Sequence, residues 1–158
     1  MKLLAGRPMV ERQLERLGRC RTLHRIVVAT STEASDDPLA AHLKGLGVDV
    51  FRGSLSDVLG RYVGAAHTFG ATGQVVRLTA DCPLADSGVI DDCVHLHARL
   101  SVDYVSNGRE RTYPHGLDVE AFGLTSWRLP TAKPATPTTA NTSRPSSTVT
   151  QSASPWPP

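Results

Sequence analysis

A short acidic turn after a buried strand is the feature of this sequence best suited to chemistry. Residues 74–79 form an apolar, β-branched run, and residues 80–84 follow with Asp81 two positions ahead of Pro83. In open α/β sheets ligands bind at the carboxyl ends of the strands, so the Asp81 carboxylate stands where a ligand is expected. A carboxylate there can bind Mg²⁺, which prefers one or two carboxylates together with substrate phosphates. Position alone leaves a second interpretation open, in which Asp81 only caps the turn before Pro83.

A second candidate site is the loop that follows residues 48–51, another short strand. Its polar residues and glycine are Arg52, Gly53, Ser54, Asp57 and Arg61. Backbone N–H groups at the start of the next helix favour an anion, and the two arginines add positive charge. The loop lacks the Gly-Lys-Ser/Thr signature of a Walker loop, so the pattern alone favours an ordinary turn with solvated arginines.

Histidines and cysteines give weaker signals. His95 and His97 are two positions apart on a predicted helix and face different directions, which argues against a shared metal site. His115 lies in a turn before the last predicted strand, where a solvated side chain is expected. The three cysteines are widely spaced without a Cys-x-x-Cys pair, so neither a disulfide framework nor a zinc site is predicted, and Cys82 is interpreted as a small packing residue.

The elements that position these residues alternate between helix and strand. Helices are predicted at residues 8–19, 36–46, 56–66 and 89–100, the last with Ser87 as its cap, and strands at residues 25–30, 48–51, 74–79, 103–106 and 117–122. This alternation predicts an α/β fold with a mostly parallel sheet flanked by helices. It places the two candidate loops at the same edge of that sheet.

Composition and charge limit the class of protein. The chain has 158 residues, so one domain is expected, and 17 Lys and Arg against 15 Asp and Glu give a formal net charge of +2. No basic block suggests nucleic-acid binding, and no Gly-x-Gly-x-x-Gly follows a predicted strand, which disfavours a Rossmann dehydrogenase. No apolar run approaches the ~20 residues of a membrane span and no signal peptide is evident, so we expect a soluble, cytoplasmic protein with no membrane partner.

Six segments together resemble one enzyme family. They match it in order and spacing, and they lie at residues 4–9, 26–31, 50–62, 76–84, 103–107 and 113–120. The combination is similar to the cytidylyltransferases of the spore coat polysaccharide biosynthesis protein F group, relatives of the synthetases that make CMP-activated Kdo and sialic acids. The resemblance covers nearly everything from residue 3 to about residue 124.

The resemblance implies a Rossmann-like, three-layer α/β/α nucleotide-diphosphosugar transferase fold, incomplete at both ends. It implies a reaction in which a hydroxyl of a sugar or sugar acid attacks the α-phosphate of CTP, forms a CMP-sugar and releases pyrophosphate. Catalysis of this kind depends on positioning and charge neutralisation, with Mg²⁺ as the cofactor. Members of the wider family often dimerise, so a homodimer is also an expectation.

The same resemblance assigns the site residues. Asp81 matches the family's metal-binding aspartate and is assigned as the catalytic residue. The nucleotide site is assigned to Arg52, Gly53, Ser54, Asp57 and Arg61. The sugar pocket is assigned to Asn107, Tyr113, Asp118 and Glu120, with Asp118 also a second metal ligand beside Asp81.

The chain departs from the family pattern at its start. Family members begin with a first strand and a Gly-Ser-Thr-Arg-Leu-Pro-Gly-Lys-like loop that wraps the triphosphate, and both would lie upstream of Met1. Lys2 stands too close to the turn at residues 6–8 to be the lysine of that loop. We therefore expect a partial domain at residues 1–129 that lacks a central strand, and a chain that is inactive or weakly active.

The chain also departs from the family at its end. Residues 130–158 contain no Asp or Glu and are rich in Ser, Thr, Pro and Ala, a composition that predicts disorder. Codons for residues 133–157 can be chosen so that the shifted frame encodes the Arg-Glu-His-Val-Thr-Pro-Phe segment of the family. We therefore hypothesise that this tail is out of frame, which a nucleotide sequence of the locus would test.

Two other functions stay open at this stage. The first is a non-catalytic module that binds a sugar or a partner without Mg²⁺-dependent turnover of CTP. The second is a nucleotidyltransferase that uses UTP or another triphosphate, because the missing loop would carry the residues best suited to deciding the base. The sequence defines neither the sugar nor a dimer interface.

Overall fold

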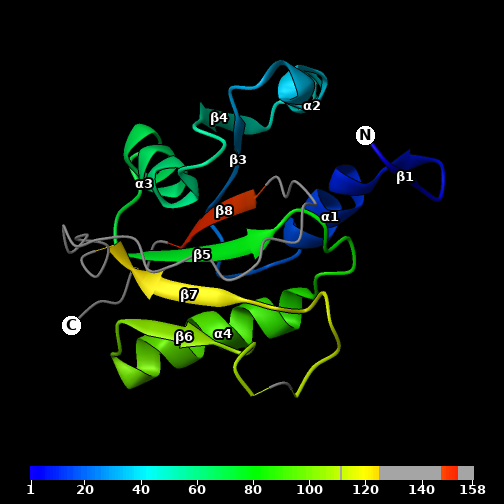
Figure 1. Ribbon diagram of the computed structural model, residues 1–158. Helices are drawn as coiled ribbons and strands as arrows, with labels where there is room; N and C mark the ends of the chain where they lie inside the picture. Colours follow the sequence, from blue (N-terminus) through cyan, green and yellow to red (C-terminus); the bar gives the residue numbers. More distant parts are fainter. Residues whose placement is uncertain (111, 125–146, 153–158) are drawn as a thin grey trace.

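The computed structural model describes residues 1–110, 112–124 and 147–152 of the chain. Six strands form one mixed sheet in the order β4-β3-β8-β5-β7-β6 (Figure 1). These strands are β3 (Arg25–Ser31), β4 (Asp49–Gly53), β5 (Gln74–Thr79), β6 (Tyr104–Ser106), β7 (Glu120–Gly123) and β8 (Ser147–Ser152). A separate hairpin of β1 (Leu3–Leu4) and β2 (Arg7–Pro8) precedes the first helix.

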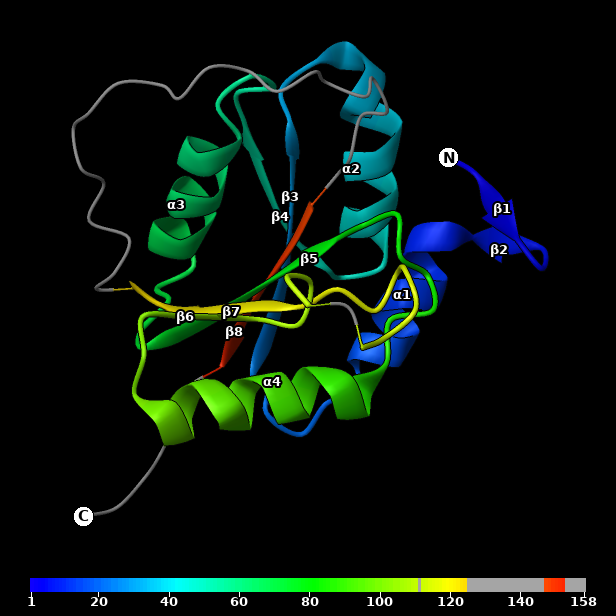
Figure 2. The same cartoon turned by 60° about the horizontal axis from the view of Figure 1, so that its bottom comes forward.

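In the part of the chain that the structure describes, four α-helices cover both faces of the twisted sheet (Figure 2). They are α1 (Met9–Leu17), α2 (Asp37–Gly45), α3 (Val58–Thr68) and α4 (Ser87–Leu100), and a short 3₁₀ helix, η1 (Ala34–Asp36), leads into α2. Alternate residues of β5 separate the two faces: Val75 packs with Tyr62 of α3, whereas Val76 packs with Leu17 of α1 and Ile90 of α4. The core therefore has α3 on one side of the sheet and the other helices on the opposite side.

Most predicted elements are confirmed, because their local signals agree with their burial. The β-branched run at residues 74–79 is strand β5, and Asp57 caps α3 through a 2.8 Å bond from the Gly60 amide. The cap of α4 differs from the prediction. Asp86, not Ser87, accepts hydrogen bonds from the Gly88 and Val89 amides at the start of that helix.

The expectation of a mostly parallel sheet is wrong for the strand pairs of the described residues. Among these, only β3 and β4 pair in parallel, in the register Val27↔Asp49 to Ser31↔Gly53. The reason is that β7 runs antiparallel to β5 and β6, and β8 runs antiparallel to β3 and β5. The strands β3, β4, β5 and β6 still point the same way, so their carboxyl ends lie at one edge of the sheet.

Residues 147–152, which belong to the tail for which disorder is expected, form strand β8 in this structure. Strand β8 lies between β3 and β5 and pairs with both, with Val149 opposite Val27 on one side and Arg77 on the other. Two neighbouring strands with unpaired backbone groups offer a place where even a Ser- and Thr-rich segment gains hydrogen bonds on both sides. The remaining tail residues, 130–146 and 153–158, lie outside the described residues, as do residues 125–129 of the predicted domain.

Candidate functional site

Asp81 lies directly after β5, at the edge of the sheet where the parallel-pointing strands end. Its side chain is exposed, and its Oδ1 atom accepts a 3.5 Å bond from the Cys82 thiol. The same thiol lies 3.3 Å from the Thr79 hydroxyl, so the Cys82 side chain links Asp81 to the last residue of β5. The Asp81 carboxylate is therefore held at the strand end and remains accessible to a ligand.

Asp81 and Asp118 both act electrostatically on the Cys82 thiol. Burial raises the pKa of Cys82, the hydrogen bond with Thr79 lowers it, and the carboxylates of Asp81 and Asp118 raise it further. A thiol with a raised pKa is a weak nucleophile at neutral pH, which agrees with its interpretation as a packing residue. A Cβ atom at Gly116, two residues before Asp118, would lie 3.9 Å from the Cys82 sulfur, so the chain that leads to Asp118 passes beside the turn that carries Asp81.

Asn107 fixes the backbone on both sides of Asp118. Its Nδ2 atom donates to the Leu117 carbonyl oxygen at 2.8 Å, and its Oδ1 atom accepts from the Val119 amide at 2.8 Å. These bonds close the loop between β6 and β7, in which Tyr113 is exposed. Asn107 thus positions Asp118, a role distinct from the sugar contact predicted for it.

Glu120 lies at the start of β7 and pairs with Arg77 of β5. The Arg77 Nη1 atom is 2.5 Å from Glu120 Oε2, and Arg77 Nε donates to the Tyr62 hydroxyl at 3.2 Å. Burial alone would lower the pKa of Arg77, but its contacts with Glu120 and Tyr62 raise it overall, so the guanidinium stays charged. Sequence analysis missed Arg77, because it lies within an otherwise apolar strand.

Two adjoining cavities open beside this ion pair. One has a volume of about 370 Å³ and is lined by polar groups that include Ser106, Asp118 and Glu120. The other has a volume of about 560 Å³ and a more apolar lining that includes Leu59 and Phe122. Both are lined by Arg77, Tyr104 and Glu120, so the two cavities are adjacent. A ligand with a polar and an apolar end could place the polar end in the first cavity and the apolar end in the second.

The predicted nucleotide loop forms a separate, internally bonded cluster at the end of β4. Arg52 donates to the backbone carbonyl oxygens of Ser31 and Glu33 at 2.8 and 3.0 Å and pairs with Asp37 at 2.6 Å. The guanidinium of Arg61 is buried and donates to the Ser54 carbonyl oxygen at 2.7 Å. Arg52 therefore joins this loop to the segment between β3 and α2, and Arg61 holds the backbone of the loop itself.

Gly53 and the polar residues of this loop also have local roles. A Cβ atom at Gly53 would lie 3.0 Å from the Phe51 ring and 3.2 Å from the Arg61 side chain, so the close packing favours glycine. The Ser54 hydroxyl accepts from the Asp57 amide at 3.1 Å. Strands β3 and β8 separate β4 from β5, so this loop lies farther along the edge of the sheet than the turn that carries Asp81.

The donor set fits a cation that is shared with a substrate. Within the described residues, no three His, Cys, Asp or Glu side chains are grouped to hold a metal ion by themselves. The carboxylates of Asp81 and Asp118 are hard oxygen donors, and Mg²⁺ is commonly bound by one or two carboxylates with phosphates completing its coordination. The site thus suits Mg²⁺ arriving with a nucleotide better than a resident metal.

Comparison with known proteins identifies the family. Residues 1–115 match the cytidylyltransferase family, and the chain therefore belongs to it. The chain is 39% identical over 119 residues to an uncharacterized protein of Methanocaldococcus jannaschii, covering 75% of this chain and 47% of that protein. It is 37% identical over 79 residues to the spore coat polysaccharide biosynthesis protein SpsF of Bacillus subtilis, covering 50% of this chain and 32% of that protein.

A solved structure supports the same assignment. The chain resembles a cytidylyltransferase from Leptospira borgpetersenii serovar Hardjo-bovis with a TM-score of 0.74 and 35% identity, over 79% of this chain and 53% of that one. The predicted family and the mixed α/β fold are thereby confirmed. The chain spans about half the length, or less, of these relatives. In the described part of the chain, no helix has the length and apolar character needed to cross a membrane.

Proposed function

We propose that this chain carries the metal-dependent nucleotide site of a cytidylyltransferase that transfers CMP from CTP to a sugar or sugar acid. The observation that carries the proposal is the exposed Asp81 after β5, with Asp118 lining a polar cavity at the same edge of the sheet and Gly116, two residues before Asp118, packed near Cys82. Membership of the cytidylyltransferase family supports CTP as the nucleotide. The similarity to SpsF supports an acceptor that belongs to polysaccharide synthesis. The fold proposed is the three-layer nucleotide-diphosphosugar transferase fold.

The proposed reaction needs positioning and charge neutralisation more than a covalent intermediate. A hydroxyl oxygen of the acceptor attacks the α-phosphorus of CTP and loses its proton to solvent, the bond to the bridging oxygen breaks, and pyrophosphate leaves with the electron pair. Mg²⁺ would neutralise charge on the phosphates, and Asp81 with Asp118 would hold it. Asn107 keeps the loop of Asp118 in place, and the cavities beside Glu120 would receive the acceptor.

The test is metal-dependent binding of CTP, because binding does not require that this chain complete the reaction. We expect CTP to bind in the presence of Mg²⁺ or Mn²⁺ in a calorimetric titration, with UTP as the comparison nucleotide. Asp81→Asn should weaken this binding at least about tenfold, since it removes a charged metal ligand. Its thermal stability should stay near that of the wild type, because Asp81 is exposed.

The matched control is Asp92→Asn, which makes the same change of charge at an exposed position of α4. It should leave the affinity for CTP unchanged. Equal binding by wild type and Asp81→Asn would overturn the assignment of Asp81. Binding of a sugar without any metal-dependent binding of CTP would favour a non-catalytic sugar-binding module instead.

A further inference from the structure

The loop that carries Asp81 is fastened at both ends to helix α1. Residues 80–86 connect β5 to α4 and pass beside α1 (Figure 2). Gln13 contacts the residue before this loop, and Arg16 contacts the residues at its end. Because residues three positions apart lie on the same face of a helix, one face of α1 holds both ends.

Gln13 is an unusual residue for its place in the fold. It is 1% exposed and occupies the apolar stripe of α1 together with Val10 and Leu17. Its Nε2 atom donates to the Thr79 carbonyl oxygen at 2.8 Å, while its Oε1 atom has no hydrogen-bond partner within the described parts of the chain. A buried polar atom without a partner is costly, so this glutamine is a poor choice for packing alone.

Arg16 holds the other end of the loop. Its Nε atom donates to the Ala85 carbonyl oxygen at 2.6 Å, and its Nη2 atom lies 3.5 Å from the Asp86 carboxylate. Asp86 in turn caps the first amides of α4. Arg16 therefore ties the end of the Asp81 loop and the cap of α4 to helix α1.

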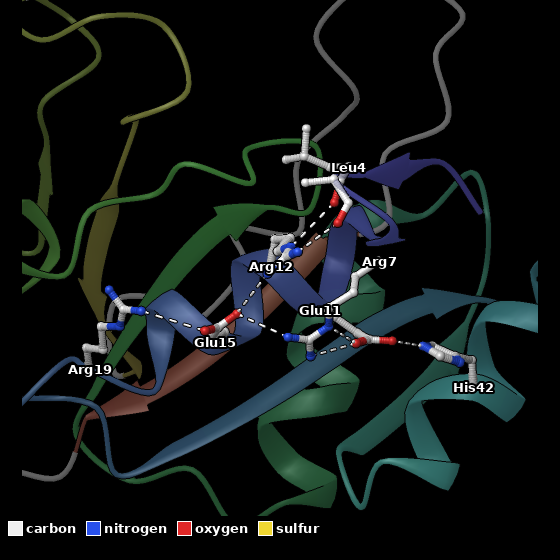
Figure 3. A network of polar contacts seen from close by, with 8 residues as sticks. Leu4, Arg7, Glu11, Arg12, Glu15, Arg19 and His42 are labelled. Atoms are coloured by element: carbon white, nitrogen blue, oxygen red, sulfur yellow. Dashed lines mark hydrogen bonds and ion pairs between the residues drawn. The ribbon is translucent and has the colours of Figure 1, made fainter.

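Helix α1 is itself held in place by contacts with α2 and with the hairpin of β1 and β2. Glu11 Oε1 lies 2.8 Å from His42 Nε2 of α2, and Arg12 Nη2 donates to the Ala5 carbonyl oxygen at 2.9 Å (Figure 3). The N-terminal hairpin and α2 are thus both attached to α1. A displacement of the Asp81 loop would have to move a helix that is fixed on two sides.

We propose that Gln13 and Arg16 are positioning residues that hold the Asp81 loop, and through it the Asp81 carboxylate, in the geometry that binds the cation. This inference rests on the proposed function for its consequence in binding, and on the contacts of α1 for the position of the loop. The two side chains touch neither the cation nor the nucleotide. They act through the backbone on either side of Asp81.

The test compares loosening of the loop with loosening of the whole fold. Cys82 lies in the loop and Cys93 lies in the core, so alkylation of each by iodoacetamide, resolved by peptide mass spectrometry, reports the two separately. Gln13→Met removes the amide that donates to the Thr79 carbonyl oxygen and keeps the size of the side chain, and Arg16→Leu removes the guanidinium group. In both variants we expect faster alkylation of Cys82 relative to Cys93, and Mn²⁺-dependent binding of CTP weakened by about tenfold.

Two further variants make the comparison specific. Arg16→Lys keeps a donor and should restore part of the binding. Arg19→Leu removes an exposed arginine from the turn after α1, where it contacts only Glu15 among the ion pairs of the described residues, and should change neither readout.

The outcomes separate this inference from the proposed function. If Cys82 and Cys93 become reactive together, Gln13 and Arg16 only stabilise the fold and the inference is wrong. If Cys82 alone is released while the affinity for CTP is unchanged, the loop is held but its position does not serve binding, which also overturns the inference. If the wild-type chain shows no metal-dependent binding of CTP, the proposed function fails, while the ratio of Cys82 to Cys93 still decides whether the loop is held.

Discussion

Asn107 shows how one amide side chain can set the position of a neighbouring carboxylate. It donates to the Leu117 carbonyl oxygen and accepts from the Val119 amide, so the residue between them, Asp118, has its backbone fixed on both sides. An amide side chain carries both a donor and an acceptor, and no carboxylate can make this pair of bonds when ionised. The requirement for asparagine therefore comes from the backbone of the loop.

Replacement of Asn107 by aspartate should loosen this loop. Asn107→Asp keeps the acceptor for Val119 but sets a carboxylate against the Leu117 carbonyl oxygen, so we expect a loss of about 1–3 kcal/mol in the free energy of unfolding. Urea denaturation monitored by circular dichroism would measure it. Ser106→Ala, which removes the acceptor for the Gly108 amide at 3.0 Å, is the neighbouring control and should cost less. Equal stability of wild type and Asn107→Asp would contradict the role given to this side chain.

At the scale of elements, the contacts of α1 with β2, through Arg7, and with α2, through His42, depend on the ionised form of Glu11. The hydrogen bond from Arg7 lowers the pKa of Glu11 from its ordinary 4.5, burial partly opposes this change, and His42 lowers it further. Because the folded state favours the carboxylate, its stabilising contribution is present above pH 4.5 and is lost as the pH falls through the lowered pKa. These contacts should therefore weaken in acid.

A substitution can isolate this pH dependence. Glu11→Gln removes the titrating group and keeps the size of the side chain, so the variant should be less stable than the wild type at pH 7. The difference in melting temperature between the two proteins should shrink as the pH falls below 4.5. Thermal unfolding by circular dichroism between pH 7 and pH 3 would show it. Glu33→Gln, an exposed position before η1, is the control, and a constant difference across the range for Glu11→Gln would refute the assignment.

The elements that sequence reasoning predicted well are those in which local pattern and burial agree. Strand β5 is a β-branched run that is largely buried, and its bounds follow from the sequence alone. Gln13 was not predicted as a site residue, because it lies within an amphipathic helix. It occupies the apolar face of that helix between Val10 and Leu17, and a glutamine there is a signal that could have been used. Strand β8 could not be predicted, since its pairing depends on two strands more than 65 residues away in the sequence.

The candidate site was predictable to the extent that it follows strand ends. Asp81 lies at the edge where ligands were expected, because the direction of β5 and its neighbours fixes that edge. Asp118 was assigned to the site only through the resemblance to the family. The bonds that occupy Arg52 and Arg61 were not predictable, since they run to backbone carbonyl oxygens whose positions only the folded chain defines. Their assignment to nucleotide binding stays a prediction.

At the scale of the whole molecule, β8 joins two parts of the sheet. In the described structure, β3 and β4 lie on one side of it and β5, β7 and β6 on the other. Side-chain packing also links the two parts, because Val27 of β3 and Val75 of β5 belong to one cluster with Tyr62 of α3. The backbone groups of β3 and β5 that face each other, however, depend on β8 for their hydrogen bonds.

A proline in β8 should therefore destabilise the entire sheet. Val149 pairs with Val27 and Arg77, and in a strand bonded on both sides each amide points toward one neighbour or the other. Val149→Pro removes a donor and leaves a carbonyl oxygen of a neighbouring strand unpaired, so we expect a loss of at least about 2 kcal/mol in unfolding free energy. Val149→Thr keeps both the amide and a β-branched side chain and is the matched control. Chemical denaturation of the three full-length chains would measure the effect. If Val149→Pro unfolds at the same denaturant concentration as the wild type, β8 does not hold the two parts together and the sheet is stabilised by its helices alone.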